Sequence, residues 1–302
     1  MRQLRCQVEP RIDWKRWNGL SDWTKHQEER FAKDSVIEEA LKNPIQRERS
    51  DVAVKFVGGP GLKVLDVGCG DGAISELIHN NGNECWGMDL ADVVTTVPSE
   101  RRAWLKAFGC DASEKAWIPH GYGVFGGEVH MLGDRGPGGI IYGSNIEPVP
   151  SEFFDAIFAG EIIEHMLDLE PFLTEAWRVL KPGGRLILTT PNAVRTLNRV
   201  AMLLGSVHTW HEWDKGVPHH CRYFTPETLQ LAMVRYGFKP ARIGWGRSQA
   251  EGSPLGFSND WLDEFSAEER GALLKILERS CPGPEWRHSF IILEARKEEV
   301  KP

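Results

Sequence analysis

The stretch that most constrains the fold is VLDVGCGDG at residues 64–72, an apolar run that ends in glycines at alternate positions. Such a run is typical of a buried strand, and a strand followed by glycines and a helix presents backbone N–H groups at its carboxyl end. Gly68, Gly70 and Gly72 have no side chains, so a ligand can approach the main chain closely. The dinucleotide fingerprint is G-x-G-x-x-G, and this stretch departs from it because the third glycine comes one residue early. The stretch therefore predicts a ligand cradle and leaves the ligand open.

Strand-like and helix-like patterns alternate along the rest of the chain. Strand-like runs occupy 62–67, 84–89, a short run ending at 110–111, 153–160, 183–192, 237–246 and 286–297. Helical patterns occupy 73–82, 100–109, 161–180 and 225–237, the last with a threonine cap at Thr225 and Pro226 at its first position. Such an alternation predicts an α/β fold with a doubly wound, mostly parallel sheet that helices cover on both faces.

Three segments stand outside this alternation. Residues 1–60 are polar and tryptophan-rich, and they predict an N-terminal helical cap with a helix that Asn43-Pro44 ends. The remaining residues, 61–302, then form the main domain. Within it, residues 115–150 hold nine glycines and residues 193–224 form a second insertion. Insertions of this length in a compact domain are typically functional loops, so we expect both to form a lid.

Charge and cysteine usage narrow the classes of partner. A net charge of -7 and a pI of about 5.8 give no general attraction to nucleic acid or to an anionic membrane. The chain lacks both an apolar run of membrane-spanning length and a signal-peptide pattern. Its six cysteines form no CxxC pair. We therefore expect a cytoplasmic protein that acts on a small molecule, with nucleic acid and membrane disfavoured. The oligomeric state stays open, a homodimer included.

Carboxylates end the second and third predicted strands. Asp89 lies where a carboxylate accepts both hydroxyls of a ribose, and Asp111 lies where one reaches an adenine edge. A helix cap or a solvated turn is the alternative reading of either residue alone. Together with Asp66 on the first strand, they favour a site for an adenosine-like ligand.

With these motifs the chain resembles the class I S-adenosylmethionine-dependent methyltransferases over residues 62–238. The quoted glycine loop, Asp89, Cys110-Asp111, FDAIFAGEIIEH and RVLKPGGRLILTTPN carry the resemblance. It implies a Rossmann-like sheet of seven strands with the last one antiparallel, and S-adenosylmethionine as cofactor. The cofactor-binding residues that it implies are Asp66, Gly68, Cys69, Gly70, Asp89, Leu90, Asp111, Ala112, Gly160 and Glu161.

The segment EIIEH at 161–165 is the main candidate for the chemistry. On a helix, Glu161, Glu164 and His165 would be spaced i, i+3 and i+4 and would lie on one side. Two carboxylates and an imidazole can bind Mg²⁺ or Mn²⁺, or they can act as an acid–base pair. The segment resembles the ExxEH element of ubiquinone-pathway O-methyltransferases and of small-RNA 3′-terminal 2′-O-methyltransferases, which implies a metal on these three residues. The alternative is a contact from Glu161 to the cofactor, a helix cap at Glu164 and a structural His165.

The segment HHCRYF at 219–224 is the second candidate. His219 and His220 precede the predicted helix at 225–237, and either can complete the metal site or act as a base. Arg222 can pair with a carboxylate or phosphate of the substrate. The aromatic residues here are walls of an acceptor pocket or packing of the lid: Trp210, Trp213, Tyr223 and Phe224.

These motifs leave several functions open. The sulfonium methyl of the cofactor is already activated, so an amine needs only positioning, whereas a hydroxyl must also lose its proton to a base or a metal. The leading prediction is O-methylation of a small-molecule phenol or sugar hydroxyl. The alternatives are 2′-O-methylation of an RNA 3′ end, N- or C-methylation by positioning alone, and a binding module without chemistry.

Overall fold

The computed structural model describes a sheet, the helices that cover it and parts of the loops at its carboxyl edge. The described residues are 36–88, 101, 150–166, 169–195, 198–199, 220, 222–246, 266, 268–269, 271–272, 275–276 and 288–298.

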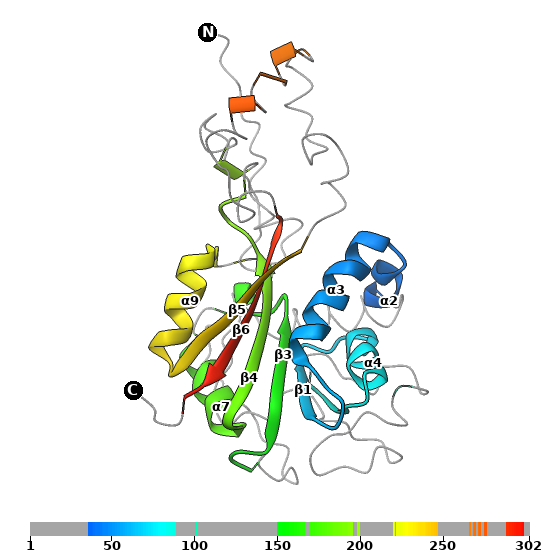
Figure 1. Cartoon of the computed structure of the whole chain (residues 1–302), viewed down its shortest axis with the longest axis vertical. Helices are drawn as coiled ribbons and strands as arrows, with labels where there is room; N and C mark the ends of the chain where they lie inside the picture. Colours follow the sequence, from blue (N-terminus) through cyan, green and yellow to red (C-terminus); the bar gives the residue numbers. More distant parts are fainter. Residues whose placement is uncertain are drawn as a thin grey trace, which may run out of the picture.

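The sheet has six strands in the order β2-β1-β3-β4-β6-β5 (Figure 1). They are β1 Lys63–Val67, β2 Glu84–Met88, β3 Phe154–Gly160, β4 Leu180–Pro191, β5 Phe238–Gly246 and β6 Phe290–Lys297. Neighbouring strands from β2 to β4 run parallel, and β6 runs antiparallel to both β4 and β5. The predicted mixed, doubly wound sheet is thus confirmed. Six of the seven predicted strands are described, and the run ending at 110–111 lies outside the described residues.

The helices form layers on both faces of this sheet (Figure 1). They are α2 Val36–Leu41, α3 Pro44–Val57, α4 Ala73–Asn80, α7 Glu170–Val179 and α9 Pro226–Arg235, with a 3₁₀ turn, η1, at Ile163–His165. Helix α3 packs on α4, β4 and β5. On the other face, Lys297 of β6 lies over the ring of Trp177 of α7, and α9 covers β5 and β6.

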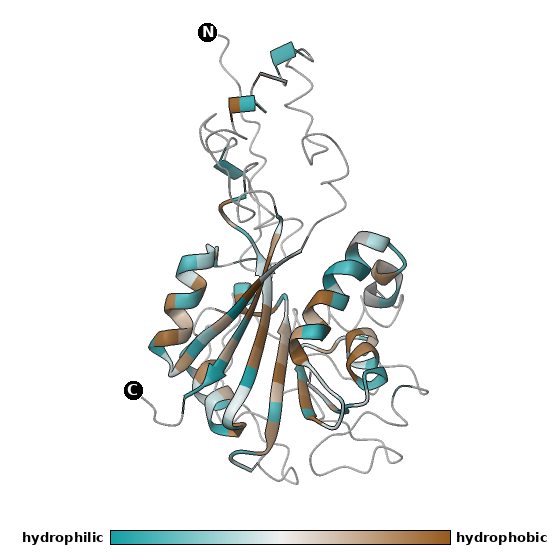
Figure 2. Cartoon of the chain, viewed as in Figure 1, coloured by the Kyte–Doolittle hydropathy of each residue, from teal (hydrophilic) through white to brown (hydrophobic). Residues whose placement is uncertain are grey.

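The core lies where these layers meet. Strands β1 and β3 are nearly continuous apolar runs, and almost all of their residues are buried, as expected of parallel strands covered on both faces. Hydrophobic residues accordingly follow the strands and the inner sides of the helices (Figure 2). Among the described residues, no helix is long and apolar enough to cross a membrane.

Helix α3 belongs to this core, although it falls within the predicted N-terminal cap. Ala53, Val54, Phe56 and Val57 are buried in the same cluster as the strands. The close fit requires glycine on the sheet, because a Cβ at Gly244 would lie 2.7 Å from the Phe56 ring. The cap is therefore continuous with the main domain from α3 onward. Residues 1–35 of the cap lie outside the described residues.

The predicted helix over 161–180 is wrong in its first half. Among its described residues, 161–166, the short turn η1 forms and Met166 is extended, and α7 begins at Glu170 with a proline in its first turn. The reason lies at Glu161, whose φ of +57° is left-handed and cannot start a right-handed helix. Two helix starts agree with prediction: α4 follows the glycines, and Thr225 caps α9 by accepting from the Thr228 N–H.

Candidate functional site

The glycine loop and the EIIEH segment lie side by side at the carboxyl edge of the sheet. Strands β1 and β3 are parallel neighbours with Val67 opposite Ala159, so Gly68 and Gly160 leave the sheet next to each other. Carboxyl edges of parallel strands are where open α/β sheets bind their ligands. The two motifs that are far apart in the sequence therefore meet at one place.

The glycine loop requires glycine at Gly68 for two reasons. Its φ of +77° is left-handed, and an added Cβ would overlap the Ile162 side chain. Ile162 follows Glu161 directly, so this contact joins the cofactor loop to the segment that carries the candidate catalytic groups. Gly70 and Gly72 also have positive φ, at +54° and +76°.

Two buried aspartates fix the shape of this loop. Asp66 lies one residue before the end of β1 and accepts a hydrogen bond of 2.5 Å from the Ser75 hydroxyl of α4, which links the strand to the helix across the loop. Asp71 accepts from the Ala73 N–H at 3.0 Å and from the Glu38 N–H of α2 at 3.1 Å. Asp66, which the resemblance implies as a cofactor-binding residue, thus connects the two ends of the glycine loop.

Arg101 braces the same loop from outside. Its guanidinium donates to the Asp71 carbonyl and to the carboxylates of Glu76 and Glu38. Burial lowers the pKa of Arg101, but the hydrogen bonds and charges of Glu76 and Glu38 raise it by more, so the pKa is raised overall. Helices α2 and α4 are thereby tied to the glycine loop through one cation.

Glu161 and Glu164 lie on either side of the end of β4. The Thr189 hydroxyl donates to Glu161 at 2.8 Å, and the Thr190 hydroxyl donates to Glu164 at 3.0 Å. Neighbouring residues of a strand point to opposite faces. The two carboxylates are therefore not on one side of a helix, as the i, i+3 spacing predicted, but on opposite faces of the sheet edge.

The surroundings of the two carboxylates also differ. The Glu164 side chain is 1% exposed. Its burial, together with the charge of Glu161, raises its pKa well above the usual range. The Thr190 hydroxyl and Arg49 lower this pKa, but by less. The Glu161 side chain is 31% exposed and lies 3.8 Å from Arg49. Burial raises the pKa of Glu161 too, against Arg49 and Thr189, and we expect a smaller rise because of this exposure.

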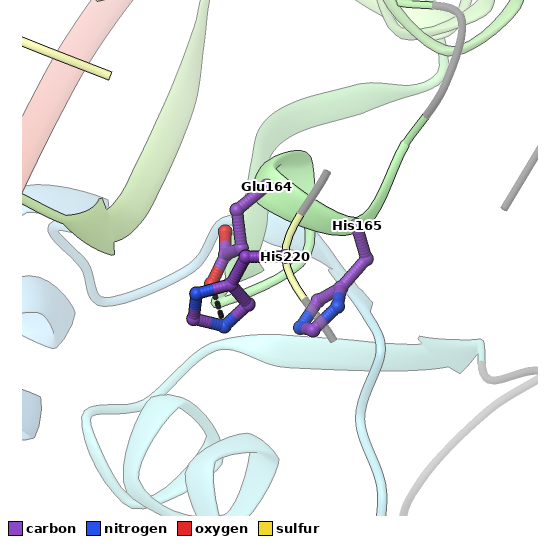
Figure 3. A group of neighbouring side chains, drawn as sticks. All are labelled: Glu164, His165 and His220. Carbon is purple, nitrogen blue, oxygen red and sulfur yellow. Dashed lines mark ion pairs between the residues drawn. The ribbon is translucent and has the colours of Figure 1, made fainter. Parts of the chain in front are cut away.

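Glu164 forms a compact group with two histidines (Figure 3). His220 Nε2 lies 3.9 Å from Glu164 Oε1, and the rings of His165 and His220 meet edge to face with centroids 4.8 Å apart. One donor atom from each of the three residues lies within 4.8 Å of the others. The group therefore has the residue types and spacing for a metal site or for a proton relay.

The segment around His220 is held against the turn η1. The Arg222 N–H donates to the Glu164 carbonyl at 3.1 Å, and Arg222 Nε donates to the Met166 carbonyl at 2.7 Å. Phe224 pairs with Asn192 at the end of β4 and is buried, whereas Tyr223 is 48% exposed. The sequence predicted that Arg222 pairs with a substrate anion, but its Nε already donates to a backbone carbonyl.

Several predicted residues lie outside the described residues. They are Asp89, Leu90, Asp111, Ala112, Trp210, Trp213, His219 and residues 115–149 of the first insertion. Within the described residues, the structure brings together Asp66, Gly68, Cys69, Gly70, Gly160 and Glu161 on the cofactor side, and Glu164, His165 and His220 beside them.

Sequence reasoning missed four contributors to the site. Arg49 of α3 faces Glu161, and Thr189 and Thr190 hold one glutamate each. Asp71 ties α2 to the glycine loop. The pair of threonines at the end of an apolar strand, TTPN, is a signal that could have been found, because polar residues at a buried strand end need partners.

Comparison with known proteins agrees with this geometry. Residues 25–242 match the family model described as a methyltransferase domain. The chain belongs to this methyltransferase family. The predicted membership of the class I S-adenosylmethionine-dependent methyltransferases is thereby confirmed.

Individual relatives point to the same family. The human mitochondrial ubiquinone biosynthesis O-methyltransferase is 30% identical over 187 residues, which is 59% of this chain and 41% of the human protein. The Rhizobium johnstonii ubiquinone biosynthesis O-methyltransferase is 27% identical, and the match covers 67% of each chain. The match thus spans less than half of the human relative and two thirds of the bacterial one.

A solved structure supports the fold alone. An S-adenosylmethionine-dependent methyltransferase from Thermotoga maritima superposes with a TM-score of 0.51 at 15% identity, over 90% of this chain and 100% of the other. At this identity the likeness concerns the arrangement of strands and helices and not the acceptor.

Proposed function

We propose that this methyltransferase transfers the methyl group of S-adenosylmethionine to a hydroxyl of a small molecule. The observation that carries the proposal is the group of Glu164, His165 and His220 beside the glycine loop. A methyl acceptor that reaches the cofactor from this side meets groups able to take up a proton. An amine acceptor does not require such groups, whereas a hydroxyl does.

In this mechanism the glycine loop holds the cofactor and the His/Glu group prepares the acceptor. The loop residues and Asp89 would bind S-adenosylmethionine, and Gly160 and Glu161 would border the place where its methyl group meets the acceptor. His220 or His165 takes the hydroxyl proton, and the Glu164 carboxylate stabilises the resulting imidazolium across the 3.9 Å contact. When bound, S-adenosylmethionine would supply an activated methyl group to the deprotonated acceptor oxygen, with S-adenosylhomocysteine as the leaving group.

The same residues fit a divalent metal. A buried carboxylate and two imidazoles with donor atoms within 4.8 Å of one another form a mixed N/O set. Such a set suits Mn²⁺ better than Mg²⁺, which prefers oxygen ligands. When bound, the metal would supply Lewis-acid stabilisation of the acceptor oxyanion. Glu164, His165 and His220 would hold it, in place of the predicted set with Glu161, which faces Thr189 and Arg49 instead.

The relatives favour a phenolic acceptor. Both reported relatives are named ubiquinone biosynthesis O-methyltransferases. A catechol is the simplest acceptor of that class, because its first hydroxyl is acidic enough for an imidazole to deprotonate it with modest help. The net charge of -7 also favours a small acceptor over a polyanion.

The second candidate is 2′-O-methylation of an RNA 3′ end. It is favoured by the same observation, a Glu/His/His group that could hold a metal near a ribose hydroxyl. Salt distinguishes the two acceptors, since RNA binding weakens steeply with added salt and binding of a small phenol does not.

The proposal is tested by activity on a matched panel of acceptors. Formation of S-adenosylhomocysteine is measured with 3,4-dihydroxybenzoate, with its 3,4-di-O-methyl derivative, with an aromatic amine and with a short RNA, each with Mn²⁺ and with a chelator. We expect turnover with the catechol and none with an acceptor whose hydroxyls are all blocked. Turnover of the amine alone would refute the O-methyl proposal, and chelator-resistant turnover would leave the histidines as bases without a metal.

A further inference from the structure

We infer that Arg222 is a positioning residue, which holds His220 against Glu164 by clamping residues 222–224 onto the turn η1. The inference rests on the proposed function of the Glu164, His165 and His220 group. It replaces the anion-binding role that the sequence predicted for Arg222.

His220 needs such a device because it comes from a distant part of the chain. Glu164 and His165 share one short turn, so their relative placement is local, whereas Arg222 and the turn are 56 residues apart in sequence. Between them lie α7, β4 and the second insertion. Ordering such a segment at one place costs conformational entropy, and specific contacts must offset it.

Arg222 supplies two of these contacts itself. Its backbone N–H donates to the Glu164 carbonyl at 3.1 Å, and its side-chain Nε donates to the Met166 carbonyl at 2.7 Å. The two acceptors flank His165 in the chain. Arg222 thus binds the turn on both sides of His165. His220, the other candidate base, lies two residues before Arg222 in the chain.

The far end of the segment is anchored separately. Phe224 is buried and pairs with Asn192, and its carbonyl accepts from the Ala193 N–H at 2.9 Å. Asn192 is in turn fixed by the Ser289 and His288 carbonyls, to which its backbone and side-chain N–H groups donate. The contacts of Phe224 fix the segment at the end of β4, and the contacts of Arg222 hold the segment close to η1.

The chemistry of the side chain fits this role. A guanidinium is charged at all working pH values, and a charged donor makes a stronger bond to a carbonyl than a neutral donor does. Its Nε donor has a fixed direction in a planar group, which a lysine ammonium lacks. We therefore expect lysine to retain the charge at this position but not the placement of His220.

The test is a double-mutant cycle with His220. Arg222→Ala, Arg222→Lys, His220→Ala and the double variant are compared for kcat with 3,4-dihydroxybenzoate and for binding of S-adenosylhomocysteine. We expect Arg222→Ala to lower kcat by about 30-fold with cofactor affinity within about twofold, and to have little further effect once His220 is absent. Arg222→Lys should fall between. Arg235→Ala is the matched control, because this arginine lies on α9 with its guanidinium over the Tyr236 ring.

Amide hydrogen exchange is the second measurement, and it needs no acceptor. Loss of the clamp should speed exchange in 162–166 and 222–224 and leave β1 and α4 unchanged. Unchanged exchange in both segments overturns the clamp whether or not the catechol is a substrate. Equal losses from Arg222→Ala with and without His220 would show a general structural role. If His220→Ala keeps full turnover, the proposed catalytic group fails instead, and the exchange result still decides the clamp.

Discussion

The two sides of the site are built in different ways. The glycine loop of the cofactor side is one continuous stretch, from Asp66 to Ser75, in which backbone geometry and local hydrogen bonds set the shape. The acceptor side is assembled from separate pieces of chain: the turn η1, the end of β4 and the segment around His220. Ile162 joins the two sides by packing over Gly68.

This difference predicts that the acceptor side can vary while the cofactor side is kept. A cradle made of backbone tolerates few changes, because each glycine conformation is required. On the acceptor side, by contrast, one side chain can be replaced while the others keep their positions. Breaking each side selectively should therefore give different kinds of failure, affinity for the cofactor on one side and turnover on the other.

The largest effect is expected from Gly68→Val on the cofactor side. Valine at a φ of +77° is strained by about 1–2 kcal/mol, and its side chain also displaces Ile162. We expect binding of S-adenosylhomocysteine, measured by calorimetry, to weaken at least about a hundredfold.

Gly183→Val is the control for this variant. Gly183 has a similar φ of +71°, but an added Cβ meets nothing within 4 Å. It should lower the melting temperature through backbone strain alone and leave cofactor affinity unchanged. Equal cofactor affinity in the two variants would show that the loop at Gly68 does not shape the cradle.

On the acceptor side, Glu164→Gln should lower kcat by about a hundredfold or more, because the neutral amide cannot stabilise a protonated His220. Cofactor affinity should stay within about twofold. Glu161→Gln is the matched comparison, since its amide oxygen can keep the Thr189 hydrogen bond at the same sheet edge. Single-turnover kinetics with saturating cofactor separates a loss of kcat from a loss of cofactor affinity in each variant. A similar kcat loss in both variants would argue that the carboxylates act as one unit.

The sequence predicted the cofactor side better than the acceptor side, for the same reason. Strands β1 to β6 and the loop at Gly68 were predicted correctly, because each depends on residues next to one another. The EIIEH segment was predicted to be a helix with three groups on one side. Its true geometry depends on the left-handed Glu161 and on which face of β4 each threonine takes, and both are set by tertiary contacts.

Helix α3 was missed for a related reason. Its first half, PIQRER, is polar and gives little amphipathic pattern, so the segment was read as part of an outer cap. Its second half packs under the sheet where Gly244 leaves room for Phe56. That fit involves residues far apart in sequence, which no local pattern contains.

Glu164 should also make the metal-free protein less stable at neutral pH. Its folded-state pKa is raised by burial and by Glu161, so the folded form holds its proton more tightly than the unfolded form does. The stabilisation from this proton is complete below the ordinary value of 4.5 and is lost as pH rises through the folded pKa. Glu164→Gln should thus raise the free energy of unfolding at pH 7 by on the order of 1 kcal/mol and change nothing near pH 4.

Chelated wild type and variant are compared by thermal unfolding across this pH range. Glu161→Gln should shift stability in the same direction by less, since it removes the charge that contributes to the Glu164 shift. A variant less stable than wild type at pH 7 would mean that Glu164 stays ionised and is stabilised in the folded protein.

The smallest effect is expected from Asp71→Ala, which loosens the cofactor side without touching its backbone. Asp71 is fully buried, accepts from Ala73 at the start of α4, and holds the Glu38 N–H of α2. Losing a helix-start acceptor of this kind costs about 1 kcal/mol of stability, and cofactor affinity should fall only severalfold because the glycines keep their conformations. Asp51→Ala is the control, since the 45% exposed Asp51 pairs with Arg47 within one helix and should change unfolding by less than about 0.5 kcal/mol. If Asp71→Ala abolished cofactor binding, the cradle would depend on its side-chain braces as much as the acceptor side does, and the contrast between the two sides would no longer hold.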